Sequence, residues 1–343
     1  MLVDAALAGV PVVVLGAPGM AAAAVRRYTR AGARVRAVTS ADALTSEVLA
    51  TARLAVVVEP QQWSAQVALL RRHCLVVTEA AGPPERGRIV LVGAGPGGSE
   101  LLTLAGAAAL ADADVVLTDR LASTDLTRMA PGADVVDVGK RPGHHAVPQR
   151  QIEAMLVARA REGLTVVRLK GGDPYVFGRG GEEVAAAVAA GLPVTVVPGV
   201  TSAVSVPAAV GIPLTHRGVS SIFTVVSGHV PLGEEQATSL ARLGGTIVLL
   251  MAMHSLVQLT ASLERAGLDP ATPAAVVERG HTSGQRSMTS TLGALAADAA
   301  REGSRAPAVV VIGDVVRQAQ VSRRRRLADV EGVRWAAPSG APR

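Results

Sequence analysis

The sequence contains few of the residues that several functional classes need. Aromatic side chains make up only 2% of its 343 residues, which leaves little material for the stacking platforms of single-strand nucleic-acid binders. The one cysteine, Cys74, excludes an internal disulfide and is compatible with a reducing compartment. The seven histidines lack the spacing of metal ligands, so we expect no metal site.

The net charge of +6 is concentrated at the C-terminal end of the chain. Residues 317–343 contain seven arginines against Asp329 and Glu331, which leaves about +1 for the rest. The arginine run at 323–326 follows the last expected strand and is more typical of a solvated tail than of a nucleic-acid site. We therefore expect no nucleic-acid partner and a basic, disordered tail over residues 319–343.

Two apolar stretches resemble membrane segments only in composition. Residues 184–215 carry no charge, but four prolines and three glycines divide them into pieces too short to span a bilayer. At the N-terminus, Asp4 stands where a signal peptide has basic residues, and Gly16 and Pro18 interrupt the apolar run. The sequence therefore predicts a cytoplasmic protein without a membrane partner.

Short β-branched runs alternate with alanine-rich stretches along the chain, which is the pattern of a parallel α/β sheet. Pro83-Pro84 marks a linker, and a helix is expected over 148–163, from a first-turn proline to a capping glycine. The expected strands are 12–15, 35–38, 54–58, 74–78, 88–92, 164–169, 194–197, 222–226, 246–250, 274–277 and 308–312. The last four of these indicate a further lobe.

A glycine-rich segment, residues 93–98, directly follows an expected strand and precedes a helix. Glycines at such a point let the main chain approach a ligand closely. A Rossmann phosphate loop is one interpretation, although Pro96 removes a main-chain donor. A tight strand-to-helix turn is the other, and the segment alone leaves both open.

A second segment, residues 170–183, contains five glycines and two of the six aromatic residues of the chain. It follows an expected strand, and loops at strand ends of open α/β sheets are where ligands bind. Asp173 could accept a hydrogen bond from a ligand or cap its own turn. A third segment, residues 138–149, contains Lys140, Arg141, His144 and His145, which suits either a carboxylate-bearing substrate or a solvated basic loop.

Six segments in series closely resemble those of uroporphyrinogen-III C-methyltransferases in the tetrapyrrole methylase family. They are the 93–98 loop, the Asp119-Arg120 pair, the 139–141 loop, the Gly-Gly-Asp-Pro segment at 171–174, and residues 198–203 and 211–217. The resemblance extends from about residue 88 to about residue 316. It implies a two-lobed fold that holds S-adenosylmethionine between its lobes and methylates uroporphyrinogen III at two ring carbons to give precorrin-2.

The resemblance also assigns roles to individual positions. Asp119 and Lys140 match the proton acceptor and the proton donor of that family. The positions expected to line the cofactor are Pro96, Gly171, Gly172, Asp173, Val176, Thr201, Ser202, Met251 and Gly280. The substrate carries many carboxylates, so the expected substrate-binding residues are Arg120, Arg141, His145, Arg179 and Arg217. As in that family, a homodimer is expected.

Some positions depart from the pattern of the family. Gly98 stands where aspartate is common, so the following helix would lose a cap, with Ser99 nearby as a replacement. Ser202 replaces a frequent alanine, and Ala252 stands where glycine is usual, which puts cofactor affinity more than activity in question. From the residues alone, Asp119 is also interpretable as a helix-start aspartate that follows a strand at 115–117.

The first 84 residues resemble a shortened form of the NAD-binding domain of sirohaem synthases. Pro18 occupies the position of the middle glycine of the fingerprint, and Thr39-Ser40 follow the second strand where an acidic residue would bind ribose. We therefore predict a degenerate Rossmann-like domain at 1–84 and a methylase domain at 85–318, with lobes at about 85–200 and 215–318. The alternative is a bifunctional enzyme that also oxidises precorrin-2 with NAD. Sirohaem and cobalamin both stay open as the end product.

Overall fold

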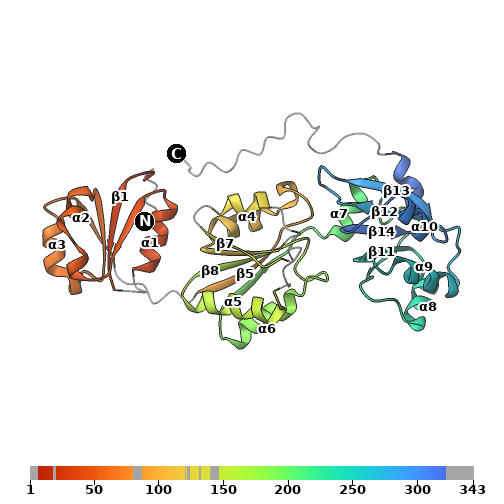
Figure 1. The fold of residues 1–343 in the computed structure, drawn as a ribbon, viewed down its shortest axis with the longest axis horizontal. Helices are drawn as coiled ribbons and strands as arrows, with labels where there is room; N and C mark the ends of the chain where they lie inside the picture. The colour runs from red at the N-terminus through yellow and green to blue at the C-terminus, as the bar shows by residue number, and fades with distance from the viewer. Residues whose placement is uncertain are drawn as a thin grey trace.

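The computed structural model describes residues 7–17, 21–79, 87–119, 121, 124–130, 133–139 and 147–321. Within these residues the strands form three sheets, and each sheet is built from one continuous part of the chain (Figure 1). The predicted α/β fold class is confirmed. Every strand expected from the sequence is present, with ends that agree or differ by one residue.

The first sheet is parallel, with the strand order β2-β1-β3-β4. Its central strands are apolar throughout and buried because helices cover both faces. The strands are β1 (Pro11–Leu15), β2 (Arg34–Val38), β3 (Leu54–Val58) and β4 (Leu75–Glu79), and the helices are α1 (Ala22–Arg30), α2 (Ser46–Thr51) and α3 (Ser64–Leu70). Short 3₁₀ segments lie at Ala41–Ala43 and Pro60–Trp63. From α1, Arg26 donates a hydrogen bond to the Gly163 carbonyl of the next unit at 3.2 Å.

The second sheet is also parallel, with the order β7-β6-β8-β5-β9. Its strands are β5 (Arg88–Gly93), β6 (Val115–Thr118), β7 (Asp134–Asp137), β8 (Thr165–Lys170) and β9 (Val194–Val197). Helix α4 (Leu104–Ala111) covers one face, and α5 (Gln149–Arg161) and α6 (Gly180–Ala189) cover the other (Figure 1). Because the strands are parallel, their carboxyl ends and the loops that follow share one edge.

The third sheet is mixed, with the order β10-β11-β14-β12-β13, and only β10 and β11 pair in parallel. Its strands are β10 (Phe223–Ser227), β11 (Thr246–Leu250), β12 (Pro273–Glu278), β13 (Arg286–Thr291) and β14 (Ala308–Ile312). The helices are α7 (Ser202–Ala208), α8 (Glu234–Leu243), α9 (Leu256–Arg265) and α10 (Leu295–Arg301). Val206 of α7 packs on one face, and α9 and α10 pack on the other.

The uncharged stretch 184–215 is divided among α6, β9 and α7, as its prolines and glycines predict. In the described part of the chain, no helix is long and apolar enough to cross a membrane. The predicted domain boundaries stay predictions, since the linker prolines and most of the basic tail lie outside the described residues.

The helical segment that directly follows Gly98 has no side-chain cap, as predicted, but this segment is not α4. Gly98 precedes a short 3₁₀ segment, Ser99–Leu101, and α4 begins only at Leu104. Its cap is Thr103, whose Oγ1 accepts a hydrogen bond from the Gly106 amide at 3.0 Å. Gly98 and Ser99 are therefore not required at the start of α4.

Candidate active site

Two glycine-rich loops pair with each other at the carboxyl edge of the second sheet. They follow the adjacent strands β5 and β8, so they leave the sheet side by side. The Gly95 amide donates to the Gly172 carbonyl at 3.2 Å, and the Gly172 amide donates to the Gly95 carbonyl at 3.0 Å. These two bonds form an antiparallel bridge, which fixes the loops relative to each other.

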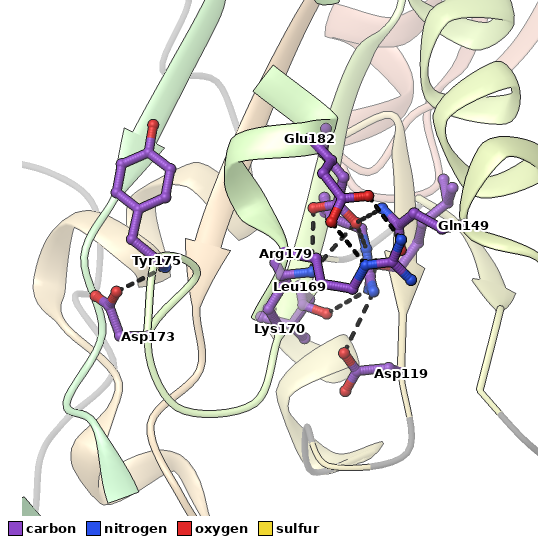
Figure 2. Close-up of polar contacts among 11 residues, drawn as sticks. Asp119, Gln149, Leu169, Lys170, Asp173, Tyr175, Arg179 and Glu182 are labelled. Atoms are coloured by element: carbon purple, nitrogen blue, oxygen red, sulfur yellow. Dashed lines mark hydrogen bonds and ion pairs between the residues drawn. The ribbon is translucent and has the colours of Figure 1, made fainter. Parts of the chain in front are cut away.

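The loop after β9 joins the same point. A Cβ added to Gly199 would lie 2.6 Å from the Gly93 Cα, so this approach requires the absence of a side chain. Asp173 ties the loops together: its Oδ2 accepts from the Gly199 amide at 3.0 Å, and its Oδ1 accepts from the Tyr175 amide at 2.8 Å. Asp173 therefore caps its own turn, as one interpretation predicted (Figure 2). It also contacts the neighbouring loop through the Gly199 amide.

Residues that belong to the third sheet and its helices meet these loops, and we call this meeting point the junction. Val176 packs against the apolar cluster that contains Val206 and Val248. Gly280 follows β12 so closely against α7 that an added Cβ would lie 2.7 Å from Val206 Cγ1. Thr201 caps α7 through its Oγ1, which accepts from the Ala203 amide at 3.3 Å. Ser202 begins that helix, and Met251 directly follows β11.

Asp119 directly follows β6 and points toward β8 (Figure 2). Its Oδ2 lies 3.3 Å from Arg168 Nη2, and its Oδ1 accepts from the Leu121 amide at 3.1 Å. The next helical segment in the described residues is the 3₁₀ turn at Thr124–Met129. The bond from the Leu121 amide is the kind that a helix-start aspartate also accepts, and the guanidinium of Arg168 is an additional partner, so both interpretations of Asp119 stay predictions.

Behind Asp119 lies a buried charged cluster that the sequence analysis missed. Arg168 Nε donates to Glu183 Oε1 at 3.0 Å, and Lys170 Nζ donates to the same oxygen at 3.1 Å. The side chains of Arg168, Lys170 and Glu183 are 4%, 5% and 0% exposed. Arg168 also donates to the carbonyls of Leu117 and Leu169. The sequence contains a signal for this cluster. Arg168 and Lys170 lie two positions apart on a strand expected to be buried, so they share one face of the sheet and need an acidic partner.

Burial lowers the pKa of Lys170, and the like charge of Arg168 acts in the same direction. The carboxylates of Glu183 and Asp119 oppose this shift. Gln149 at the start of α5 adds an amide donor to Glu183 Oε1 at 3.4 Å. The cluster thus connects three elements, β8, α5 and α6, directly beneath the edge where Asp119 lies (Figure 2).

The predicted substrate-binding residues divide into two groups. Arg120, Arg141 and His145, together with the predicted proton donor Lys140, lie outside the described residues. Arg179 is exposed and donates to both carboxylate oxygens of Glu182, at 2.8 and 2.6 Å. Arg217 belongs to the loop 215–221, which lines an open pocket of about 600 Å³.

Comparison with known proteins identifies the relatives of the chain. The family model of tetrapyrrole (corrin/porphyrin) methylases matches residues 88–296. A uroporphyrinogen-III C-methyltransferase of Methanocaldococcus jannaschii is 45% identical over 234 residues, which cover 67% of this chain and 97% of that protein. An S-adenosyl-L-methionine-dependent uroporphyrinogen III methyltransferase of Methanosarcina barkeri is 46% identical over 235 residues, which cover 67% of this chain and 92% of that protein.

A solved structure gives the same result. The uroporphyrin-III C-methyltransferase of Thermus thermophilus in complex with S-adenyl homocysteine has a TM-score of 0.56 and 43% identity, and the match covers 67% of this chain and 99% of that one. The sirohaem synthase of Edwardsiella ictaluri is 44% identical over 239 residues, which cover 69% of this chain but only 51% of that protein. The chain therefore belongs to the tetrapyrrole methylase family.

Proposed function

We propose that the protein transfers methyl groups from S-adenosylmethionine to two ring carbons of uroporphyrinogen III, giving precorrin-2. The observation that carries the proposal is the meeting of three glycine-bearing loops at one sheet edge that also holds the ion-paired Asp119. The identity of 45–46% to relatives named for this activity supports it.

The residues at the junction fit S-adenosylmethionine. An added Cβ on Gly172 would meet only the Ser202 amide, at 3.8 Å, so there is open room beside main-chain donors. Met251 is 48% exposed and thus accessible to a ligand. These features suit a small polar ligand with an apolar part. The residues proposed to hold it are Pro96, Gly171, Gly172, Asp173, Val176, Thr201, Ser202, Met251 and Gly280.

The bound cofactor would supply a methyl group that is already electrophilic, because it is attached to a sulfonium. The reduced pyrrole carbon that receives this group is already electron-rich, so the protein mainly has to align the two reactants. The paired loops serve this purpose, since Gly95, Gly172 and Asp173 are fixed by main-chain hydrogen bonds. No strong activation by side chains is needed for the transfer itself.

The methylated macrocycle is then positively charged and must lose a proton from another of its atoms as the ring rearranges, and we propose that Asp119 accepts this proton. Its side chain is 26% exposed, so a substrate can reach it, and Arg168 holds it from the buried side. Lys140 is proposed as the proton donor. Arg120, Arg141, His145, Arg179 and Arg217 are proposed to bind the substrate carboxylates, for which guanidinium groups provide paired donors.

We further propose that the protein is a cytoplasmic homodimer. Large apolar side chains are exposed in the methylase portion, among them Tyr175, Phe177 and Phe223 at 59%, 45% and 41%. Exposed apolar area of this kind is typical of an interface. Light scattering should therefore give about twice the chain mass of 34.8 kDa at micromolar concentration, and the monomer mass would contradict the dimer.

The function is tested by incubating the protein with S-adenosylmethionine and uroporphyrinogen III. Mass analysis of the tetrapyrrole should show the gain of two methyl groups. Binding of S-adenosylhomocysteine, measured by calorimetry, shows independently that the protein is folded and able to bind the cofactor. An unchanged tetrapyrrole mass with intact binding would overturn the choice of substrate.

A further inference from the structure

His281 lies where the second and third sheets approach each other. It belongs to the turn after β12 and directly follows Gly280. The loop after β5 contacts this turn, because a Cβ added to Gly97 would lie 2.7 Å from the His281 Cβ and closer still to its carbonyl oxygen. Contacts of that length are sterically forbidden, so only glycine at position 97 lets the loop and the turn come together.

The ring of His281 makes a second connection. Its Nε2 lies 2.8 Å from the carbonyl oxygen of Ser205 in α7. A carbonyl can only accept, so Nε2 carries a hydrogen and donates it. Ser205 is one turn after Thr201, and both its amide and its hydroxyl donate to the Thr201 carbonyl. His281 therefore contacts α7 at Ser205, whose carbonyl also accepts from the Ala209 amide at the end of the helix. The Ser205 amide and hydroxyl connect this point to Thr201, which together with Ser202 is proposed to meet the cofactor.

The main chain of the turn is held in an unusual conformation. Arg279 and His281 have φ angles of +48° and +63°, a left-handed region that non-glycine residues rarely adopt. Between them, Gly280 packs against Val206 of the same helix. The His281 amide donates to Gln285 Oε1 at 2.8 Å, which closes the turn. Such conformations persist only where surrounding contacts determine them, and they are concentrated at functional sites.

We propose that His281 is a positioning residue for the cofactor site. Its hydrogen bond to Ser205 and its contact with Gly97 set the separation between the glycine-rich loop of one lobe and Gly280 of the other. The cofactor is proposed to contact both sides of this separation, so His281 controls its affinity. The inference rests on the proposed binding of S-adenosylmethionine at this junction.

Calorimetry with S-adenosylhomocysteine tests the role of the ring. His281→Ala should weaken binding about tenfold, the effect of losing one hydrogen bond of ordinary strength. His281→Gln, which keeps an amide donor, should stay within about threefold of the unchanged protein. His73→Ala, at an exposed histidine outside the methylase portion, is the control and should bind normally.

A pair of glycine substitutions tests the contact without removing the ring. Gly97→Ala introduces both left-handed strain, at φ +83°, and the collision with His281. Gly191→Ala introduces similar strain, at φ +69°, with no atom within 4 Å of the new Cβ. Only Gly97→Ala should weaken binding of S-adenosylhomocysteine.

Kinetics separate positioning from a general loss of structure. In His281→Ala the KM for S-adenosylmethionine should rise, while kcat and the KM for the tetrapyrrole stay near their original values. Normal affinity in His281→Ala, or equal effects of the two glycine substitutions, would overturn the inference. Failure of the unchanged protein to bind S-adenosylhomocysteine would instead overturn the proposed function.

Discussion

The guanidinium of Arg168 and the carboxylate of Glu183 meet at 3.0 Å, with side chains that are 4% and 0% exposed. Lys170 binds the same carboxylate, so one buried anion is shared by two buried cations. Removing charges from water is unfavourable, and such a cluster is stable only while all its members are present. Because Arg168 also contacts Asp119, the cluster holds the carboxylate of the proposed base from the buried side.

Replacement of Glu183 should therefore destabilise the fold. Glu183→Gln keeps the shape of the side chain but leaves Arg168 and Lys170 buried without an anion between them. We expect a loss of about 3–5 kcal/mol in the free energy of unfolding, measured by urea denaturation. Glu182→Gln is the matched control, since its partner Arg179 is exposed, and it should change stability far less.

The loss caused by Glu183→Gln should also depend on pH. The pKa of Lys170 is already lowered by burial and by Arg168, and removal of the carboxylate lowers it further. Between this lowered value and the ordinary 10.5, the unfolded chain binds the proton and the folded chain does not. The free energy of unfolding of Glu183→Gln therefore rises with pH across that range, and its difference from the unchanged protein should become smaller. A defect that is constant up to pH 10.5 would show that Lys170 does not titrate there.

Asp119→Asn should lower turnover about a hundredfold or more, because the amide keeps the shape of the side chain but cannot accept the proton. Calorimetric binding of S-adenosylhomocysteine should be nearly unchanged. Asp137→Asn is the matched control, since Asp137 ends the adjacent strand β7 and its carboxylate similarly accepts from a turn amide, that of Gly139. Turnover of Asp119→Asn within about twofold of normal would contradict a role as base.

The N-terminal sheet should lose stability at alkaline pH. Burial raises the pKa of Tyr28 above 10.0, and its neighbour Glu79 adds to the shift. The folded chain thus keeps a proton that the unfolded chain releases, so the stabilisation is present below pH 10.0 and lost as the pH rises beyond it. Fluorescence of the buried Trp63, in a Trp335→Phe background, reports unfolding of this unit.

Tyr28→Phe should remove part of this alkaline loss. The rest is expected from Cys74, because burial raises the pKa of that thiol above 9.0 and acts in the same direction. An identical pH dependence in Tyr28→Phe would show that the phenol does not contribute.

We predict that residues 1–84 do not bind NAD. Gly16 follows β1 as in a dinucleotide site, but no acidic residue directly follows β2; Asp42 lies further on, in the 3₁₀ segment Ala41–Ala43. Calorimetry with millimolar NAD should show no binding, and a chain that starts near Glu85 should keep methyl transfer. Tight NAD binding or oxidation of precorrin-2 would favour the bifunctional alternative.

The strands could be predicted because they are short β-branched runs, and this signal is local. The buried cluster was harder to predict, since Glu183 lies on a helix and reaches Arg168 only through packing of α6 on the sheet. The cap of α4 could not be predicted from Gly98, because a 3₁₀ segment lies between Gly98 and this helix, whose cap is Thr103. His281 carried no recognisable signal, because its partners Gly97 and Ser205 come from distant parts of the chain.

The bridge between Gly95 and Gly172 constrains how this site can be changed by insertion or loop exchange. Its bonds run between main-chain atoms, so side-chain substitutions elsewhere in the loops leave them intact, whereas one added residue shifts the alignment of both loops. A loop transplanted from another methylase would have to be moved together with its partner. The two segments are 77 positions apart in the sequence, but we expect them to change together in evolution.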